Sequence, residues 1–230
     1  MSKFIKYLDS VQIIMKKTKE KILAKSLTLF NEHGVDSVKI RDITTELGMH
    51  VGNLNYYFPT KNDILYALCM EFIYKVDKAI EKVLTKQAQG VLEQMYLQAD
   101  IIFSVQLEYR FMFSKRYAEI ISSLPSVQQH YQTTLKTRFT EWLGFHSLLV
   151  DHKLAYPNLV EESNSLSYVL NILAIFWQQE ATIYMPNMTD DQKKKHALSV
   201  YFFTYKPYLT KSGLDELMPL LRKLDLYKEP

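Results

Sequence analysis

Helix-breaking residues are scarce in this chain. Glycine and proline occupy only 6 and 7 of its 230 positions. Between them, apolar residues recur every three or four positions over long stretches, which is the spacing of helices that bury one face. The sequence therefore predicts an all-α fold with long helices and few turns.

The few breaks divide the chain into predicted helices. Gly34 and Gly48 each follow a periodic stretch, at the point where a left-handed residue ends a helix and costs glycine least. Ser37 is a candidate cap for the helix that follows it, and Thr60 with Asp63 forms a variant of the capping box for another. The first predicted helix covers residues 18–33, the second lies between Ser37 and Gly48, the third is 49–58, and a long fourth follows Thr60 and reaches at least Ile80. Helical patterns follow near 91–113, 115–122, 126–149, 160–185, 190–208 and 213–227.

Residues 1–14 precede the first clear helix. Their apolar positions have helical spacing, so the segment is either an amphipathic N-terminal arm or the run-in to the helix at 18–33. Met15 offers an alternative start, in which case the first fourteen residues are a misassigned beginning of the chain.

The predicted helix "MHVGNLNYYF" (49–58) carries little apolar surface, although both of its neighbours are amphipathic. Met49, Leu54 and Phe58 can anchor it inward, and Pro59 ends it. A helix of about seven residues is roughly 10 Å long, which fits a DNA major groove about 12 Å wide. We therefore interpret it as a helix that reads DNA. The alternative, a polar connector between packed helices, leaves the glycine turn and the proline stop unexplained.

The residues on and around this helix have the chemistry that DNA recognition needs. Asparagine offers a paired donor and acceptor that match the edge of adenine, and tyrosine hydroxyls and basic side chains can bind phosphates. A glycine lets the backbone approach a phosphate or a base closely. The candidate DNA-binding residues are Lys39, Arg41, Thr45, His50, Val51, Gly52, Asn53, Asn55, Tyr56, Tyr57 and Lys61.

Positive charge is concentrated in the same part of the chain. Residues 1–62 contain 10 lysines and arginines against 6 aspartates and glutamates, a net +4, while the remainder contains 18 against 19, a net −1. This distribution favours a nucleic-acid-binding head on a neutral body. A chance imbalance of four charges is the alternative.

At this point a family resemblance can be stated. The run "ILAKSLTLFNEHGVDSVKIRDITTELGMHVGNLNYYFPTKNDIL" resembles the N-terminal domain of the TetR family of bacterial transcription regulators, over about a fifth of the chain. The positions that meet the family pattern are Ile22, Leu23, Ser26, Leu29, Phe30, Gly34, Ile40, Arg41, Asp42, Ile43, Gly48, Met49, Gly52, Leu54, Phe58, Pro59, Lys61 and Ile64.

Three positions depart from the family pattern. His50 stands where the family usually has a serine or threonine cap, and Val51 stands where lysine, arginine or glutamine is common. Asn55 replaces the first of the usual tyrosines. The operator sequence of a relative therefore does not transfer to this chain.

The resemblance implies a three-helix helix–turn–helix domain at residues 1–62 and a larger helical ligand-binding and dimerisation domain at 63–230. It further implies a ligand-responsive repressor that binds double-stranded, palindromic operator DNA as a homodimer. A small and largely apolar molecule would release it from the DNA. Dimerisation is expected through the helices near 160–185 and 190–208, with Val169, Leu170, Leu173, Trp177, Ala197 and Tyr201 as candidate interface residues.

The second domain is rich in aromatic residues, which are candidates to line an apolar pocket or, alternatively, to fill the core. The pocket candidates are Tyr96, Phe103, Tyr109, Met112, Phe113, Arg116, Phe139, Trp142 and Phe176. Glu108, Arg110 and Arg116 are candidates to orient a ligand, with solvated surface charges as the alternative.

Other classes of protein are disfavoured. The six histidines lack metal-ligand spacing, and the chain has no GxSxG, no HExxH and no phosphate-binding glycine loop, so we expect no enzyme, no metal and no cofactor. A helical interaction protein that no longer uses its head on DNA is a second rival, favoured only by His50 and Val51.

The location of the protein follows by elimination. No stretch reaches the roughly 18 uninterrupted apolar residues of a membrane span, and the N-terminus lacks a secretion signal. The single cysteine, Cys69, excludes an internal disulfide and is predicted to be a small core residue. We therefore expect a cytoplasmic protein without a membrane partner.

Overall fold

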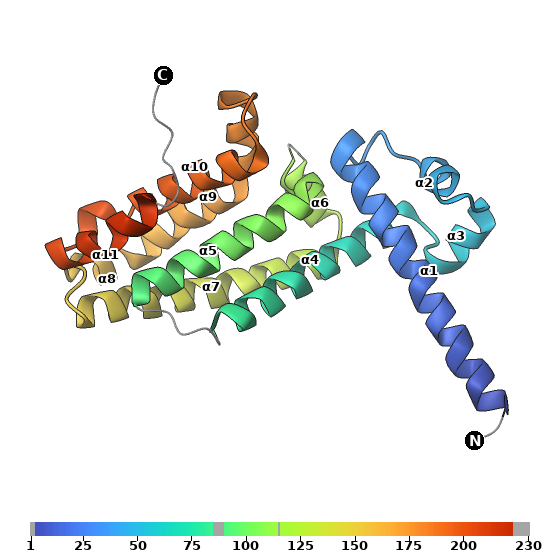
Figure 1. Cartoon of the computed structure of the whole chain (residues 1–230), viewed down its shortest axis with the longest axis horizontal. Helices are drawn as coiled ribbons and strands as arrows, with labels where there is room; N and C mark the ends of the chain where they lie inside the picture. The colour runs from blue at the N-terminus through green and yellow to red at the C-terminus, as the bar shows by residue number, and fades with distance from the viewer. Residues whose placement is uncertain (1–2, 85–89, 115, 223–230) are drawn as a thin grey trace. The chain divides into compact units, whose positions relative to one another are not determined.

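A computed structural model describes residues 3–84, 90–114 and 116–222, and the side chains of these residues from Met15 onward except Leu84. The chain divides into two compact units, Met1–Phe72 and Ile73–Pro230, which are described separately. Within the described ranges every regular element is a helix (Figure 1), apart from an isolated bridge between Ala155 and Leu209. The all-α prediction is confirmed.

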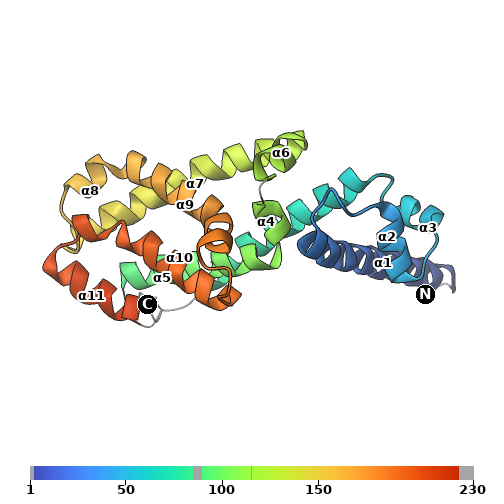
Figure 2. The ribbon, with the colours of Figure 1, turned by 90° about the horizontal axis from the view of Figure 1, so that it is seen from above.

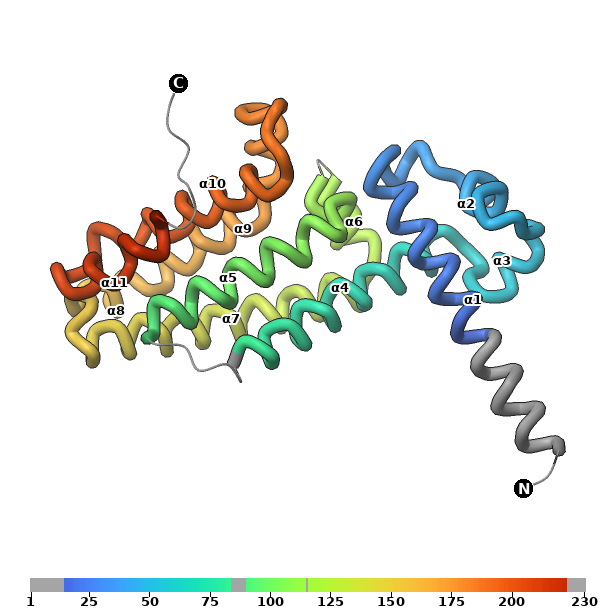
Figure 3. The backbone as a smooth tube through the Cα atoms, in the orientation of Figure 1, coloured from blue at the N-terminus to red at the C-terminus, as the bar shows by residue number. Residues whose placement is uncertain are grey.

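The first unit contains α1 (Lys3–His33), α2 (Ile40–Leu47), α3 (Val51–Tyr57) and the beginning of α4 (Lys61–Leu84). The helix α1 runs from Lys3 to His33 without a break, so it is longer than the helix predicted at 18–33. Figure 3 follows the path of the chain from α1 through α2 and α3 into α4. The core of the first unit is made of apolar side chains from all four helices, among them Ile22, Phe30, Ile43, Leu54 and Ile64.

The ends of these helices follow the predicted chemistry with one exception. Gly34 and Gly48 both have positive φ, +78° and +61°, as residues that end helices. The N-terminus of α2 is capped at Lys39, whose backbone N–H donates to the Asp42 carboxylate at 2.7 Å. The prediction that Ser37 caps this helix is therefore wrong, because the chain between Gly34 and α2 runs two residues further before the helix begins.

The capping box predicted at the start of α4 is confirmed. The backbone N–H of Thr60 donates to Asp63 Oδ2 at 2.8 Å, and the backbone N–H of Asp63 donates to Thr60 Oγ1 at 3.3 Å. Further along α4, Cys69 is buried as predicted, and burial raises the pKa of its thiol to about 12. The thiol is therefore un-ionised and unreactive at neutral pH.

The second unit is built around four long helices. These are α5 (Val91–Glu108), α7 (Pro125–Asp151), α9 (Ser163–Tyr184) and α10 (Asp190–Phe203). Both α7 and α10 contact α5 and α9, which closes a ring of four helices (Figures 1 and 2). Shorter elements surround the ring: η1 (Arg110–Phe113), α6 (Tyr117–Ser122), α8 (Asn158–Glu161), η2 (Lys206–Tyr208) and α11 (Lys211–Arg222). Of the helix predicted at 213–227, residues 223–227 lie outside the described part of the chain.

Two hydrogen-bonded clusters connect the helices of the ring. Gln106 accepts the indole N–H of Trp177 at 2.6 Å and donates to the carbonyl oxygen of Ala174 at 3.0 Å, which ties α5 to α9. His146 on α7 is buried between Ser163 Oγ at 2.7 Å and Tyr205 Oη at 3.1 Å. Burial lowers the pKa of His146 from 6.5 to about 4, so its ring is neutral at neutral pH.

Among the helices described, none combines the length and the apolarity that a bilayer crossing requires.

Candidate functional site

The short helix α3 lies on the first unit with one buried side and one exposed side. Leu54 is fully buried and Phe58, directly after the helix, is 6% exposed, so these two residues anchor it. Asn53 and Asn55 are exposed, and the side chain of Tyr56 is 71% exposed. The polar residues of α3 therefore face outward, while Leu54 and Phe58 pack its other side against the first unit.

A tight turn sets the position of α3 against α2. The backbone N–H of Gly48 donates to Thr45 O at 3.1 Å, and that of Met49 donates to Thr44 O at 3.0 Å. This pattern needs the left-handed conformation that Gly48 adopts. The two helices and the turn form a helix–turn–helix in which α3 takes the place of the helix that enters the major groove.

The other predicted DNA-binding residues surround α3. Lys39, Arg41, Thr45, His50, Val51 and Gly52 are exposed, and Tyr57 is half-buried with its ring edge-to-face on Tyr56, the centroids 5.2 Å apart. Apart from the chain neighbours of Gly52 and the backbone of its own helix, no atom of the described residues lies within 4 Å of the place where a Cβ on Gly52 would sit. Space is therefore open for backbone to approach a partner at this residue.

Lys61 is engaged within its own unit. Its ammonium group donates to the carbonyl oxygens of Val35 at 2.8 Å and Val38 at 3.1 Å, in the segment that leads into α2. An ammonium group has three hydrogens, so one remains for a phosphate. Holding this segment in place is the role that the geometry gives to Lys61.

The difference in net charge between the two parts of the chain is smaller when the chain is divided at Phe72, the end of the first compact unit, than at residue 62, the predicted limit of the first domain. Met1–Phe72 contains 10 basic and 8 acidic residues, a net +2, because Asp63 and Glu71 lie beyond the predicted limit of the first domain. The remaining residues contain 18 basic and 17 acidic side chains, a net +1. The net charge therefore hardly distinguishes the two units, and the positive charge near α3 comes from individual residues such as Lys39 and Arg41.

His50 caps α3 in backbone conformation only. It has extended geometry, but its side chain makes no capping hydrogen bond. In a His50→Ser variant the hydroxyl could accept a hydrogen bond from a free backbone N–H in the first turn of α3. We therefore expect the free energy of unfolding to rise by about 1 kcal/mol. Urea denaturation measures this change. His50→Ala removes the same imidazole without adding an acceptor, so an equal gain in both variants would contradict the capping explanation.

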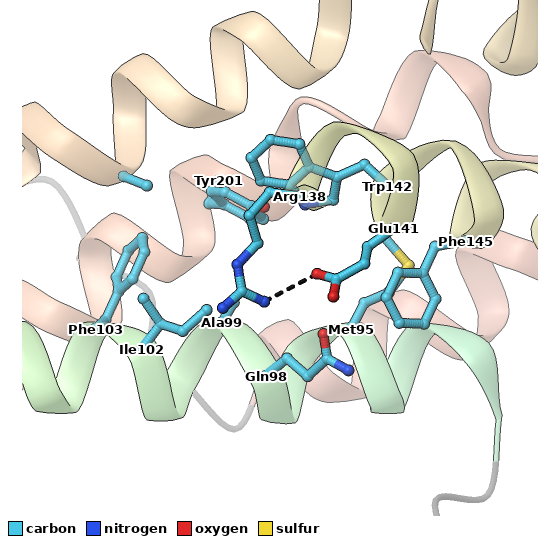
Figure 4. A pocket seen from close by; sticks show the side chains of 11 residues that line it. Met95, Gln98, Ala99, Ile102, Phe103, Arg138, Glu141, Trp142, Phe145 and Tyr201 are labelled. Carbon is cyan, nitrogen blue, oxygen red and sulfur yellow. Dashed lines mark hydrogen bonds and ion pairs between the residues drawn. The ribbon is translucent and has the colours of Figure 1, made fainter. Parts of the chain in front are cut away.

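The second unit contains a cavity of about 60 Å³ inside the ring of helices (Figure 4). Its wall is mainly apolar, and its charged groups are Arg138 and Glu141 of α7, which form an ion pair at 2.9 Å. The lining residues are Met95, Gln98, Ala99, Ile102, Phe103, Arg138, Glu141, Trp142, Phe145, Ala174 and Tyr201.

Of the predicted pocket residues, the structure brings Phe103 and Trp142 into this cavity. Tyr109, Met112 and Phe113 are buried in the core, and Phe176 is 47% exposed on the outside of α9. Tyr96 packs on Phe202 with a centroid distance of 5.9 Å, and Phe139 lies beside Trp142 at 5.7 Å. Helical spacing identified apolar faces but did not say whether a face meets the core, the cavity or solvent.

The charged residues predicted to orient a ligand lie in ion pairs away from the cavity. Glu108 pairs with Lys75 at 2.8 Å, Arg110 pairs with Asp190 at 2.8 Å, and Arg116 pairs with Glu119. The cavity instead uses Arg138 and Glu141. The signal for them was present in "TRFTEWLGF", where Arg138 shares a helical face with Trp142 and Phe145.

The predicted dimer residues fall into two groups. Leu170, Trp177, Ala197 and Tyr201 are buried inside their own unit, and Tyr201 lines the cavity, so these four present no surface to a partner. Val169 is 46% exposed and Leu173 is half-buried. The exposed apolar side chains of α9 and α10 are instead Tyr168, Val169, Ile172, Phe176, Ile183, Tyr184, Val200 and Phe203.

A helix–turn–helix with an exposed polar second helix, joined to a helical unit with an internal cavity, defines a helix–turn–helix transcriptional regulator. A family model described as "Bacterial regulatory proteins, tetR family" matches residues 22–68, and one described as "Bacterial transcriptional repressor" matches residues 76–217. The chain belongs to the TetR family of bacterial transcriptional regulators.

Individual relatives agree with this assignment. The "Probable HTH-type transcriptional regulator YttP" of Bacillus subtilis (strain 168) is 22% identical over 209 residues, which are 90% of this chain and 93% of the relative. Among solved structures, a TetR-family transcriptional regulator from Marinobacter aquaeolei VT8 has a TM-score of 0.78 and 23% identity, covering 90% of this chain and 98% of that one. A protein from Saccharomonospora viridis solved in complex with choline has a TM-score of 0.63 and 17% identity, covering 82% and 96%. These structural likenesses show the fold.

Proposed function

We propose that this protein is a cytoplasmic, ligand-responsive repressor that binds a palindromic operator as a homodimer. Residues 1–62 are the DNA-binding domain and residues 63–230 the ligand-binding and dimerisation domain. A small molecule in the second domain releases the repressor from DNA. The observation that carries the proposal is the outward polar face of α3, with Asn53, Asn55 and Tyr56 exposed above a buried Leu54.

The exposed residues divide the work of binding DNA. Asn53 and Asn55 can each make a bidentate pair with adenine, which selects sequence. Lys39, Arg41 and the Tyr56 hydroxyl bind phosphates, which sets affinity and its salt dependence. Gly52 lets the backbone of α3 approach the duplex.

The test of DNA binding is a gel-shift titration against the DNA that flanks the protein's own gene, at several salt concentrations. We expect one preferred site and a shift that weakens as salt rises. Asn53→Ala should weaken binding to that site about tenfold or more, since a good bidentate pair contributes roughly 1–3 kcal/mol. Asn164→Ala, at an exposed helical asparagine of the second unit, should bind like the parent. Equal affinity for all DNA sequences would reject the repressor.

Homodimerisation is supported by the exposed apolar face of α9. Val169, Ile172 and Phe176 are separated by three and then four residues, which is the spacing of helices that pack against a partner helix. Val200 and Phe203 extend the apolar surface on α10. A two-fold dimer through these helices would place two copies of α3 on the two halves of a palindrome.

Phe176→Glu is expected to shift the protein from dimer to monomer, because a charge would be buried in an apolar interface. Sedimentation velocity measures the change, and operator affinity should fall with it. Leu148→Glu is the matched control, since Leu148 is 43% exposed on α7 and Phe176 is 47% exposed. If both variants stay dimeric, the interface lies elsewhere.

Regulation requires two conformations that differ in their affinity for the ligand and for DNA. The cavity between α5, α7, α9 and α10 is the proposed ligand site, and its wall fits a largely apolar molecule. A protein of the same fold, from Saccharomonospora viridis, was solved in complex with a small molecule, choline.

A further inference from the structure

The cavity of the second unit carries one charged group that is poorly exposed to water. The side chain of Arg138 is 18% exposed, and it extends from α7 into the cavity toward Gln98 of α5 (Figure 4). Its partner Glu141, one turn further along α7, is 43% exposed. The arginine is thus the member of the pair that depends more on a partner, because it is the less exposed of the two charges.

The other polar groups at the cavity are the side chains of Gln98, Trp142 and Tyr201, and each of them has at least one hydrogen to donate. The hydroxyl of Tyr201 has one hydrogen to donate, and the indole N–H of Trp142 lies near it. Burial raises the pKa of Tyr201 above its ordinary value, so this hydroxyl keeps its hydrogen at neutral pH. With the guanidinium of Arg138, the cavity offers several hydrogen-bond donors and a single carboxylate.

The space suits a small molecule. A cavity of about 60 Å³ has room for roughly four to six water-sized groups, and departure of the Glu141 carboxylate would add to it. Ile102, Phe103 and Phe145 supply apolar surface around Arg138. A cation would be repelled by the guanidinium, whereas a carboxylate could accept two parallel hydrogen bonds from it.

We infer that this cavity binds a small monocarboxylate with an apolar body, held by Arg138 in place of Glu141. Glu141 turns outward into water when the ligand binds, at small cost because it is already partly exposed. The ligand keeps Arg138 paired, so this partly buried charge is not left without a partner. The inference rests on the proposed function, in which this cavity is the effector site.

The test uses isovalerate as the carboxylate probe, with isovaleramide as its neutral isostere and choline as a cation. Isothermal titration calorimetry on the full-length protein, without DNA, should detect binding of isovalerate in the millimolar range and weaker binding of the other two. Arg138→Gln should weaken isovalerate binding about tenfold or more. Glu141→Gln should strengthen it, because the ligand no longer competes with a carboxylate for Arg138.

Arg116→Gln is the matched control, since Arg116 also pairs with a glutamate three residues further on but does not line the cavity. It should bind isovalerate like the parent, and circular dichroism should show that all three variants are folded. The inference is overturned if isovalerate does not bind, if Arg138→Gln binds it equally well, or if isovaleramide or choline binds more tightly.

A gel shift with and without isovalerate separates this inference from the proposed function. Binding of isovalerate in the calorimeter without any effect on operator affinity would support the inference and reject ligand-driven release through this cavity. Absence of isovalerate binding by a protein that still binds its operator would overturn the inference and leave the repressor intact.

Discussion

Gly213→Ala is expected to destabilise the fold by about 2–3 kcal/mol, although alanine is the better helix former. A Cβ on Gly213 in α11 would lie 2.0 Å from the carbonyl oxygen of Leu154 and 3.2 Å from Leu209 Cβ. Leu154 cannot move away cheaply. Its N–H donates to Leu149 O at 2.8 Å, and its carbonyl oxygen accepts the N–H of Thr210 at 3.0 Å. The free energy of unfolding in urea measures the effect.

Gly52→Ala is the control for this prediction, because Gly52 is also helical but has open space around it. There the same change should stabilise the fold by about 1 kcal/mol, the difference in helix propensity. If the proposed function is right, it should also weaken operator binding, since the added methyl would stand between α3 and the duplex. Destabilisation of both variants by similar amounts would contradict the steric explanation at Gly213.

Acidification is expected to remove about 3 kcal/mol of stability through His146 alone. The ring is buried against Ser163 and Tyr205, and its pKa falls from 6.5 to about 4. The unfolded chain therefore binds a proton at a pH where the folded chain does not. The contribution of His146 to the free energy of unfolding is fully present above pH 6.5. It declines as the pH falls below that value and is lost by about pH 4.

Denaturation in urea at a series of pH values between neutral and about 4 measures this dependence. His146→Gln keeps a hydrogen-bonding side chain without a titrating ring, so its stability should vary less over this range than that of the parent. His152→Gln changes an exposed histidine directly after α7. The free energy of unfolding of this variant should vary with pH as it does in the parent. A parent-like slope in His146→Gln would show that other groups cause the loss.

The helix–turn–helix could be predicted because its signals are local. Gly48 sets the turn, Pro59 ends the segment that holds α3, and Leu54 and Phe58 mark the buried side, all within a dozen residues. These signals depend on backbone geometry and on helical periodicity, which can be identified without knowledge of the rest of the chain.

The cavity could be predicted only in outline, because it is formed by helices distant in sequence. Periodicity placed Tyr201 on an apolar face, but only the packing of α10 against α5 decides that this face meets a cavity and not a second subunit. Likewise, the pairs Arg138–Glu141 and Arg116–Glu119 have the same spacing, and the apolar face that Arg138 shares with Trp142 and Phe145 does not by itself say that it meets a cavity. The same ambiguity applies to the predicted dimer residues, because an apolar face can meet either the core of its own unit or a second subunit.

The two hydrogen bonds of Lys61 have a mechanical consequence. The first residue of α4 donates to two carbonyl groups that precede α2, so a displacement of this end of α4 would act directly on the segment that leads into α2. If the proposed function is right, a displacement of the start of α4 would therefore bear on how α3 meets an operator.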